Sequence, residues 1–514
     1  MSYLALKVPP IREERLKACN AYGGGAGCLL RGSKAGCLAQ TGRSFLQAAG
    51  CQFTLSLASL NTIQDSVVLL HGPLGCGVGT SMVANGIVKI NQGNRGLKQR
   101  GVVAVSTNLD EVDVISGGEQ KLRNAIVDVD RHLHPRAIFV VSSCVPAIIG
   151  DDIDTVVKDV QPQVSAKLLV LHCEGFKTKI QATAYDVTYH AILRGLFDVD
   201  EHLLPREPLV RTEEVEAREA ADERRRKRTV NLLNVSSMSW VDEVELTRLL
   251  NALDLDVNIY TCYAHPDDFI KTTEAALSIS ICPTHDDYFL SHLEELYGVP
   301  SVITTMPLGI SNTRRWLLDV ASHFGKEDLA LRIIESEERD VREAIKPLIG
   351  TLKDKTAFVC AGEFRAAGTA LLLEEDYGMK ILGVRAFHYD SFADDIFAQL
   401  PRQDEISINV APWQPFEQAN LLHKLKPDVF VGHVGGNVWA AKEGFTVIPI
   451  FSPSNSYLGY KGIFEMANRL ERVVRNSAFN RRISQHVSTP YKTSWYADEP
   501  FKFIKQDVLE ESAV

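Results

Sequence analysis

The chain has 514 residues, of which 45% are hydrophobic and 23% charged, a composition typical of a globular protein with room for about three domains. Its net charge of −10 argues against nucleic acid as a partner, because nucleic-acid-binding surfaces concentrate Lys and Arg. The opening MSYLALKVPPIREERLK is not a secretory signal, and no run of about 18 apolar residues follows, so we expect a cytoplasmic protein without a membrane span.

Residues 1–50 are rich in Gly and Cys (AYGGGAGCLLRGSKAGCLAQTG), which predicts an irregular arm rather than a core element. From residue 51 onward, short β-rich runs end in Gly, Pro or Cys loops and are followed by helical stretches. This alternation is typical of parallel-sheet α/β units. We therefore predict an α/β fold of three doubly wound, Rossmann-like domains in series.

The predicted domain boundaries follow from shifts in composition. The densely charged stretch 212–228 has no apolar stripe and predicts a solvated helix or linker, and the polar, aromatic end of the chain predicts a tail that wraps a neighbour or subunit. The resulting division is an arm at 1–50, α/β domains at 51–215, 229–350 and 355–477, and a C-terminal tail at 478–514.

Several of the ten cysteines fall where a predicted strand ends, the edge at which parallel sheets bind ligands. Cys76 lies in HGPLGCGVGTS, Cys144 follows the run AIFVVSS, and Cys51 precedes the next helical stretch. Thiolates of this kind suit an iron–sulfur cluster. The spacings of 25 and 68 residues match neither zinc ribbons nor ferredoxins, so spacing alone leaves simple burial open for each cysteine.

The loop HGPLGCGVGTS also has the glycines of a nucleotide-binding turn. It is not G-x-G-x-x-G, however, and the chain contains no G-x-x-x-x-G-K-[ST] phosphate loop. We therefore expect no nucleotide on this chain, with a metal-free dinucleotide-binding enzyme as a distant alternative.

Four blocks of sequence agree in order and spacing with one known family. They are CQFTLSLASLNTIQDSVVLLHGPLGCG, TNLDEVDVISGGEQKL, SSCVPAIIGDDIDTV and LLVLHCEGF, the last favouring an α-type over a β-type subunit. Over roughly residues 45–465, the chain resembles the α subunit of the nitrogenase catalytic component and its relatives. A fifth block, ISICPTHDDYFLSHLEELYGVP, resembles the segment that supplies the cysteine ligand of the active-site cofactor.

The resemblance implies the nitrogenase component 1 fold and two iron–sulfur sites. Cys51, Cys76 and Cys144 take the place of the α-subunit ligands of a P-cluster-type 8Fe-7S electron relay. A β-type (K) subunit would complete that cluster in an α2β2 heterotetramer, and an ATP-dependent iron protein (H) would supply electrons. Cys282 takes the place of the thiolate that holds an eight-iron or heterometal iron–sulfur cofactor. The resemblance places three candidate pocket residues for hydrogen bonding or proton delivery: Gln181, Tyr185 and His388.

Departures from the family pattern change the expected substrate. The histidine that holds the far end of the cofactor falls on Phe451, a pocket histidine on Tyr185, and an arginine after the second relay cysteine on Ala84. These differences argue against dinitrogen reduction and against a molybdenum cofactor with homocitrate. Other side chains that could replace the lost ligand are His433, Ser452, Ser454 and Asn455.

The expected function is therefore that of an oxidoreductase of the nitrogenase-like class with a small-molecule substrate other than dinitrogen. Methylthio-alkane reductase, which cleaves C–S bonds of small thioethers and releases methanethiol for sulfur supply, fits the pattern of retained cysteines and altered pocket. A scaffold for nitrogenase cofactor maturation, which also lacks the far histidine, stays open, as does a nitrogenase proper. The evenly spaced Cys19, Cys28 and Cys37 match no standard metal motif.

Overall fold

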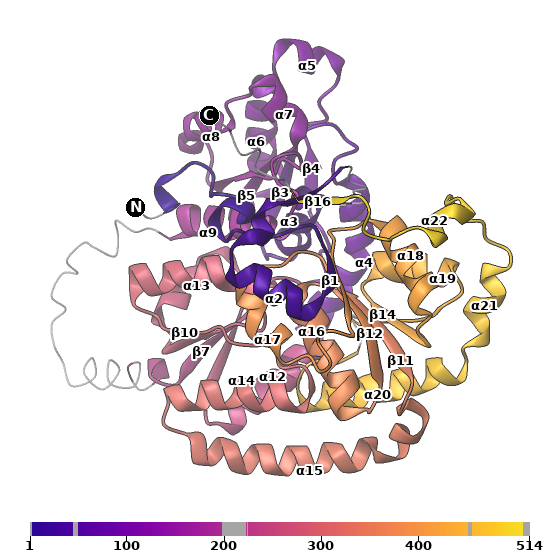
Figure 1. Ribbon diagram of the computed structural model, residues 1–514. Coiled ribbons are helices and arrows are strands. Elements are labelled where there is room, and N and C mark those ends of the chain that lie inside the picture. Colours follow the sequence, from indigo (N-terminus) through magenta and orange to yellow (C-terminus); the bar gives the residue numbers. More distant parts are fainter. Residues whose placement is uncertain (1–2, 45–49, 198–222, 224, 451–454, 507–514) are drawn as a thin grey trace, which may run out of the picture.

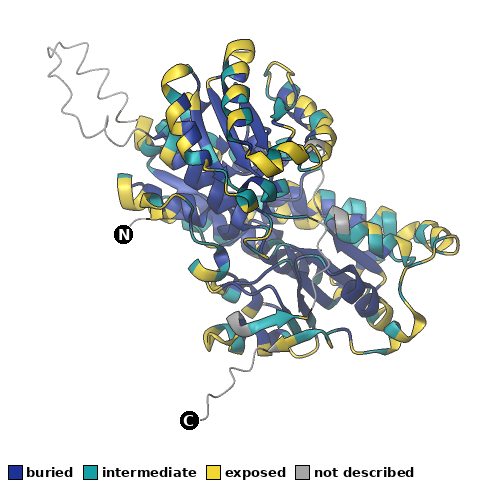
Figure 2. Cartoon of the chain, turned by 90° about the horizontal axis from the view of Figure 1, so that it is seen from above, coloured by how far each residue is buried: buried dark blue, intermediate teal, exposed yellow. Residues whose placement is uncertain are grey.

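Three parallel β-sheets, surrounded by helices, form the body of the protein in the computed structural model (Figure 1). The predicted α/β fold is confirmed. Figure 2 shows the strands buried beneath helices whose outer sides are exposed. The predicted domain boundaries stay a proposed division, and most of the charged stretch 212–228 lies outside the described residues. The described residues are 3–44, 50–197, 223, 225–450 and 455–506.

The first sheet has the strand order β4-β3-β5-β6, with every neighbouring pair parallel. β3 (Ser66–His71) and β5 (Ala137–Ser142) are almost continuously hydrophobic because both faces of the sheet are covered by helices. The other elements are α3 (Gln52–Leu60), α4 (Val78–Asn94), β4 (Ala104–Ser106), α5 (Glu111–Ser116), α6 (Glu119–Leu133), α7 (Cys144–Ile149), α8 (Ile153–Val160), β6 (Lys167–His172) and α9 (Thr183–Leu196).

The second sheet has the order β10-β9-β7-β8 and is also parallel. Its strands are short, and the long helix α15 (Glu327–Leu352) follows them. The remaining elements are β7 (Thr229–Asn234), α12 (Trp240–Ala252), β8 (Asp256–Thr261), β9 (Leu277–Ile279), α13 (Pro283–Tyr297), β10 (Ser301–Val302) and α14 (Gly309–His323).

The third sheet has the order β1-β13-β12-β11-β14-β15, and only β1 runs antiparallel to its neighbour among these described strands. The sequence patterns did not predict β13, a four-residue strand. The elements are β11 (Thr356–Ala361), α16 (Glu363–Leu371), β12 (Lys380–Ala386), α17 (Asp394–Ala398), β13 (Ser407–Val410), α18 (Pro415–Leu425), β14 (Val429–Gly432), α19 (Val434–Lys442), β15 (Thr446–Pro449) and α20 (Gly459–Arg475).

The N-terminal arm is more regular than its composition suggested. β1 (Tyr22–Gly25) is the edge strand of the third sheet, so the prediction of an irregular arm is wrong for this part. The glycines have a packing role, because a Cβ on Gly23 would collide with the Phe501 ring of the C-terminal tail. The other described elements of arm and tail are α1 (Arg12–Arg15), α2 (Ala26–Lys34), β2 (Thr41–Arg43), α21 (Ala478–Ser484), α22 (Thr493–Ala497) and β16 (Ile504–Gln506).

The C-terminal tail packs on its own chain over the described residues. β16 pairs with β2 of the arm, and Trp495 of α22 donates from its indole N–H to the Phe416 carbonyl at 2.8 Å. The tail therefore joins the arm to the third sheet.

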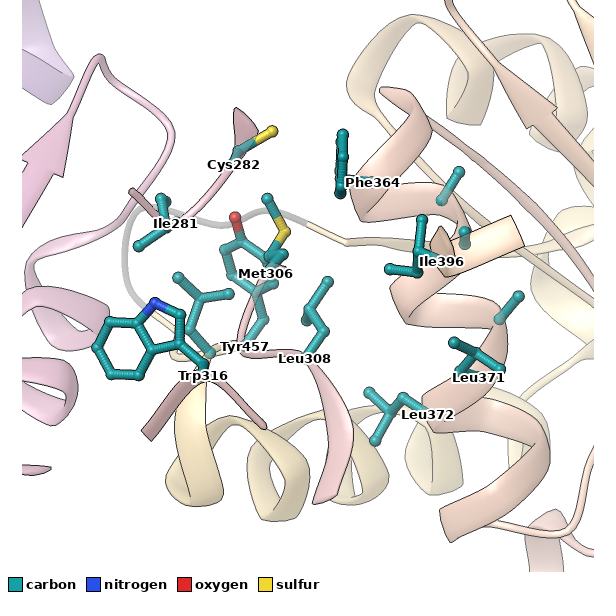
Figure 3. Packing of buried hydrophobic residues seen from close by; sticks show 14 of the residues in the cluster. Ile281, Cys282, Met306, Leu308, Trp316, Phe364, Leu371, Leu372, Ile396 and Tyr457 are labelled. Carbon is teal, nitrogen blue, oxygen red and sulfur yellow. The ribbon is translucent and has the colours of Figure 1, made fainter. Parts of the chain in front are cut away.

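One hydrophobic cluster connects the second and third sheets. Figure 3 shows Leu308 and Met306 facing Leu371, Leu372 and Ile396 across this junction. A fully buried side chain of this size contributes roughly 1.5–3 kcal/mol, so the cluster holds the two sheets in a fixed relation. Among the described helices, none combines the length and apolarity that crossing a membrane requires.

Candidate functional site

Three cysteines gather at the carboxyl edge of the first sheet. Cys51 precedes α3 as its N-cap, Cys76 lies in the loop between β3 and α4, and Cys144 begins α7 directly after β5. Each is partly exposed. Parallel strands bring their following loops to one edge, which explains how residues so far apart in sequence come together.

Gly175 lies against two of these thiols. Its backbone N–H donates to Cys144 Sγ at 3.2 Å, and a Cβ at this position would lie 2.8 Å from Cys51 Cβ and 3.1 Å from Cys51 Sγ. Burial raises the pKa of the Cys76 thiol, and the neighbouring Cys144 and Cys51 raise it further. The three sulfur atoms therefore belong to one site, with a backbone donor available to a thiolate.

Large apolar side chains surround the cysteine site at the surface. Ile115 on α5 is 87% exposed, and Val83 on α4 is 78% exposed. Exposed apolar patches of this kind mark contact surfaces for another protein. The remaining members are Leu74 in the Cys76 loop, Met82 on α4, Ile148 on α7, and Phe176, which follows Gly175 in the loop after β6.

Cys282 forms a second, enclosed thiol site. It is the N-cap of α13 and only 4% exposed. In Figure 3 its sulfur points away from Ile281 and Trp316 and toward the helix that carries Phe364. Burial raises the pKa of Cys282 to about 12, while the Arg365 guanidinium lowers it. A positive charge therefore lies close enough to stabilise a thiolate or another anionic group beside Cys282.

Arg365 was not among the residues predicted from the sequence. It is half-buried on α16, its guanidinium carbon lies 5.3 Å from the centre of the Tyr457 ring, and its Nη2 donates to the Ser237 carbonyl at 3.1 Å. Burial lowers the pKa of Arg365, but the neighbouring Tyr457, Cys282 and Tyr185 outweigh burial and raise it. A guanidinium group in this position can pair with an anionic group beside Cys282.

Tyr185 is close enough to Cys282 and Arg365 for both to act on its pKa. It is buried on α9, and its ring centre is 4.7 Å from that of His285. Burial raises the pKa of Tyr185 well above its ordinary value, so the phenol keeps its proton and can donate it in a hydrogen bond. Burial also lowers the pKa of His285 well below its ordinary value, which keeps that imidazole neutral.

Gln181 lies beside the segment that leads into Cys51. Its Nε2 would be 2.8 Å from a Cβ built on Gly50, the residue before Cys51, and α9 with Tyr185 begins two residues after it. Ala84, at the position of the lost arginine, is half-buried on α4.

His388 lies in a cluster of acidic residues beside the Cys282 site, since Glu363 of this cluster acts on the pKa of Cys282. Its Nε2 is 3.3 Å from Glu363 Oε2 and 4.0 Å from Asp390 Oδ2. Burial, and to a lesser degree Arg12, lower the pKa of His388 to about 3. His388 also acts on the pKa of His285, whose ring lies against Tyr185, so this cluster adjoins the Cys282 site.

Two of the residues that could replace the cofactor ligand lost at Phe451, His433 and Asn455, lie among the described residues. His433 is the N-cap of α19, and burial followed by Arg365 lowers its pKa to about 4, so it faces the Arg365 pocket as a neutral imidazole. Asn455 accepts a hydrogen bond from Ser239 through its backbone carbonyl. Phe451, Ser452 and Ser454 lie outside the described residues.

Similarity to known proteins agrees with this arrangement. The family model described as nitrogenase component 1 type oxidoreductase matches residues 51–475. The nitrogenase molybdenum-iron protein alpha chain of Methanosarcina barkeri is 24% identical over 488 residues, covering 83% of this chain and 86% of the relative. The nitrogenase iron-molybdenum cofactor biosynthesis protein NifE of Rippkaea orientalis is 26% identical over 439 residues, covering 83% and 85%.

Among solved structures, one titled "Nitrogenase Cp1 at pH 5" superimposes with a TM-score of 0.67 at 19% sequence identity. The match covers 88% of this chain and 93% of that chain. At this identity the likeness establishes the fold.

Proposed function

Because the chain belongs to the nitrogenase component 1 type oxidoreductase family, we propose that it is the α-type subunit of a nitrogenase-like methylthio-alkane reductase. The reaction is the reductive cleavage of a small thioether, in which R–S–CH3, two electrons and two protons give R–H and CH3SH. The observation that carries the proposal is the pairing of two thiol sites, a partly exposed group of three cysteines and an enclosed Cys282 beside Arg365.

The three-cysteine site fits half of a shared iron–sulfur cluster. Cys51, Cys76 and Cys144 would supply thiolates from one side, and the Gly175 N–H would stabilise the charge on the Cys144 sulfur. Such a cluster supplies single-electron transfer. The exposed apolar residues around the site fit a β-type subunit that would contribute the remaining ligands, and an ATP-dependent iron protein would deliver electrons.

The Cys282 site fits an anionic iron–sulfur cofactor. Cys282 would hold it as a thiolate, and the half-buried Arg365 would offset its negative charge. When bound, the cofactor supplies reducing equivalents for the C–S bond. Tyr185, which stays protonated, would donate a hydrogen bond or a proton to the sulfur that leaves as methanethiol. Gln181, beside the segment that leads into Cys51, would orient the substrate or cofactor by hydrogen bonding.

A cofactor-maturation scaffold is the second candidate. The sequence identity to a relative named as a cofactor biosynthesis protein, 26%, is similar to the identity to a relative named as a nitrogenase alpha chain, 24%. Phe451 stands where nitrogenases have the histidine that holds the far end of the cofactor, and a phenyl ring cannot bind a metal. The loss of this ligand suits a scaffold, because a scaffold must release its cofactor.

Methanethiol release separates the two candidates. The chain should be purified anaerobically with its β-type partner and assayed with 2-(methylthio)ethanol, reductant, ATP and the iron protein. A reductase releases methanethiol in proportion to its iron content. Iron without turnover of any thioether favours the scaffold, and a preparation that binds no iron contradicts both candidates.

Tyr185→Phe tests the role of the phenol in this reaction. The variant should keep its iron and lose methanethiol formation by about 10²-fold or more, because only the O–H is removed. Tyr377→Phe is the matched control, since Tyr377 is a buried tyrosine whose O–H donates to the Ile463 carbonyl away from both thiol sites. Equal turnover in the two variants would remove Tyr185 from the mechanism.

A further inference from the structure

A third group of potential ligands lies behind the Cys282 pocket and contains no cysteine. Glu363 is the first residue of α16, and His388 and Asp390 follow β12. One ligand atom from each of these three residues lies within 4.8 Å of the other two, and all three residues are buried. The resemblance places His388 alone among these three, as a pocket residue, and assigns no metal ion to the group.

The three side chains point at one another without completing hydrogen bonds. His388 Nε2, Glu363 Oε2 and Asp390 Oδ2 are buried atoms that make no hydrogen bond among the described residues. His388 is 4% exposed and directs its Nε2 at both carboxylates, at 3.3 Å and 4.0 Å. Ligands at about 2.0–2.2 Å from a common metal ion are separated by roughly 3–4 Å, which matches this arrangement.

The surroundings leave negative charge uncompensated. Arg12 is fully buried and forms ion pairs with Asp186, Asp287 and Asp390. Arg15 also pairs with Asp186 and Asp287. With Glu363 included, four carboxylates face two guanidinium groups. Two negative charges in a buried site require protons or a divalent cation.

We propose that Glu363, His388 and Asp390 bind a divalent transition-metal ion, separate from the two thiol sites. One imidazole nitrogen and two carboxylate oxygens form a mixed ligand set that suits Mn²⁺ or Zn²⁺ better than Mg²⁺ or Ca²⁺, which prefer sites made of oxygen ligands alone. Arg12 Nη1, 3.6 Å from Asp390 Oδ2, then serves as an outer partner of a ligand.

The ion has a structural role toward the neighbouring pocket. Glu363 accepts a hydrogen bond on its other oxygen, Oε1, from Thr284 Oγ1 at 2.7 Å. Thr284 is two residues beyond Cys282 on α13, whereas Glu363 belongs to the third sheet's α16. A metal that holds Glu363 therefore fixes the position of the segment that carries Cys282.

Metal counting in the full-length protein tests the proposal. Cells should be grown in Mn²⁺-supplemented medium, because iron–sulfur clusters contain no Mn and the count then reports this site alone. We expect close to one Mn or Zn ion per chain by mass spectrometry, and a loss of at least about tenfold in Glu363→Gln and Asp390→Asn. His190→Asn, which alters another buried histidine, should keep the ion. Absence of stoichiometric Mn and Zn, or equal metal in all variants, would overturn the proposal.

Thermal stability provides a second readout that does not depend on metal extraction. Glu363→Gln is isosteric and keeps the acceptor for Thr284, so the fold should be retained. If the site holds a cation, this variant loses a ligand and melts at a lower temperature than the wild type. If Glu363 is instead a neutral, protonated acid, Gln replaces one neutral group with another of the same shape and the variant melts at about the same temperature, which would contradict the proposal.

Discussion

Gly175 determines how closely Cys51 and Cys144 can approach the backbone. Its N–H donates to Cys144 Sγ, and the absent Cβ leaves space for Cys51. We predict that Gly175→Ala displaces Cys51 and lowers the iron bound at the three-cysteine site, although no ligand has been changed. Iron analysis and the relay-cluster spectrum measure this effect.

The matched control is Gly350→Ala, a position in α15 where an added Cβ meets no atom within 4 Å. It should keep the full iron content and gain up to about 1 kcal/mol of stability, since alanine favours a helix over glycine. Normal relay iron in Gly175→Ala would show that the thiols are not confined by this glycine.

The acidic neighbours of His172, at the end of β6, lead us to predict that the free energy of unfolding depends on pH. Burial alone would lower its pKa, but Asp154 and Glu174 outweigh burial and raise the pKa to about 9. The protonated His172 stabilises the fold through its ion pairs with Asp154 and Glu174. This contribution to the free energy of unfolding is fully present below the free-histidine pKa of about 6.5 and is lost as the pH rises through about 9. The shift corresponds to roughly 3 kcal/mol.

Denaturant titrations at pH 6 and pH 9.5 measure this loss. His172→Gln should show a smaller decrease in unfolding free energy between the two pH values, by about 3 kcal/mol. The exposed His132→Gln should behave like the wild type. An unchanged pH dependence in His172→Gln would exclude this ion pair as its source.

At the scale of elements, the short helix α1 connects all three sheet-bearing regions. Arg12 reaches Asp186 on α9, Asp287 on α13 and Asp390 after β12. Removing the Arg12 guanidinium leaves buried carboxylates unpaired. We therefore predict that Arg12→Ala lowers the free energy of unfolding by about 3–5 kcal/mol. Chemical denaturation measures the change.

Arg248→Ala is the control for this prediction. The Arg248 side chain is 47% exposed and pairs with Glu245 and Glu337, so its removal should cost no more than about 1 kcal/mol. Equal costs for the two arginines would mean that α1 does not hold the three regions together.

The elements that sequence could predict are those set by local pattern. Strands such as β5 and β11 are continuous hydrophobic runs that end in Gly or Cys loops, and the structure confirms them. The short β13 and the glycine-rich β1 carry no such pattern, and they form because each completes the edge of an existing sheet.

The candidate site was predictable only where the residue type itself carries chemistry. Cysteines before and after strands identified both thiol sites. Arg12 and Arg365 were missed because their partners come from distant segments, and Arg12 also lies in a charged stretch that resembles a solvated surface. The Glu363–His388–Asp390 group was missed for the same reason, although the block RAFHYD places two of its members two residues apart.

At the scale of the whole molecule, the apolar surface around the three cysteines predicts a protein contact. Ile115→Glu places a charge where the side chain is 87% exposed, so the fold should be unaffected. Association with the β-type partner should weaken by at least about tenfold, because a charge would be buried at the interface. Size-exclusion chromatography of the co-expressed subunits measures this.

Phe479→Glu serves as the control, because Phe479 is also an exposed apolar residue, on α21 and away from the cysteine edge. It should leave the complex intact. A stable complex with Ile115→Glu would place the partner on another surface.

Cluster spectra of two cysteine variants test most directly whether the chain holds two separate iron–sulfur sites. Cys144→Ala and Cys282→Ala should be purified anaerobically with the partner subunit and compared with the wild type by iron analysis and electron paramagnetic resonance. Cys144→Ala should lose the relay signal and keep the cofactor at Cys282, and Cys282→Ala should show the reverse, with no methanethiol formed. Wild-type spectra and iron content in both variants would contradict the two-site account.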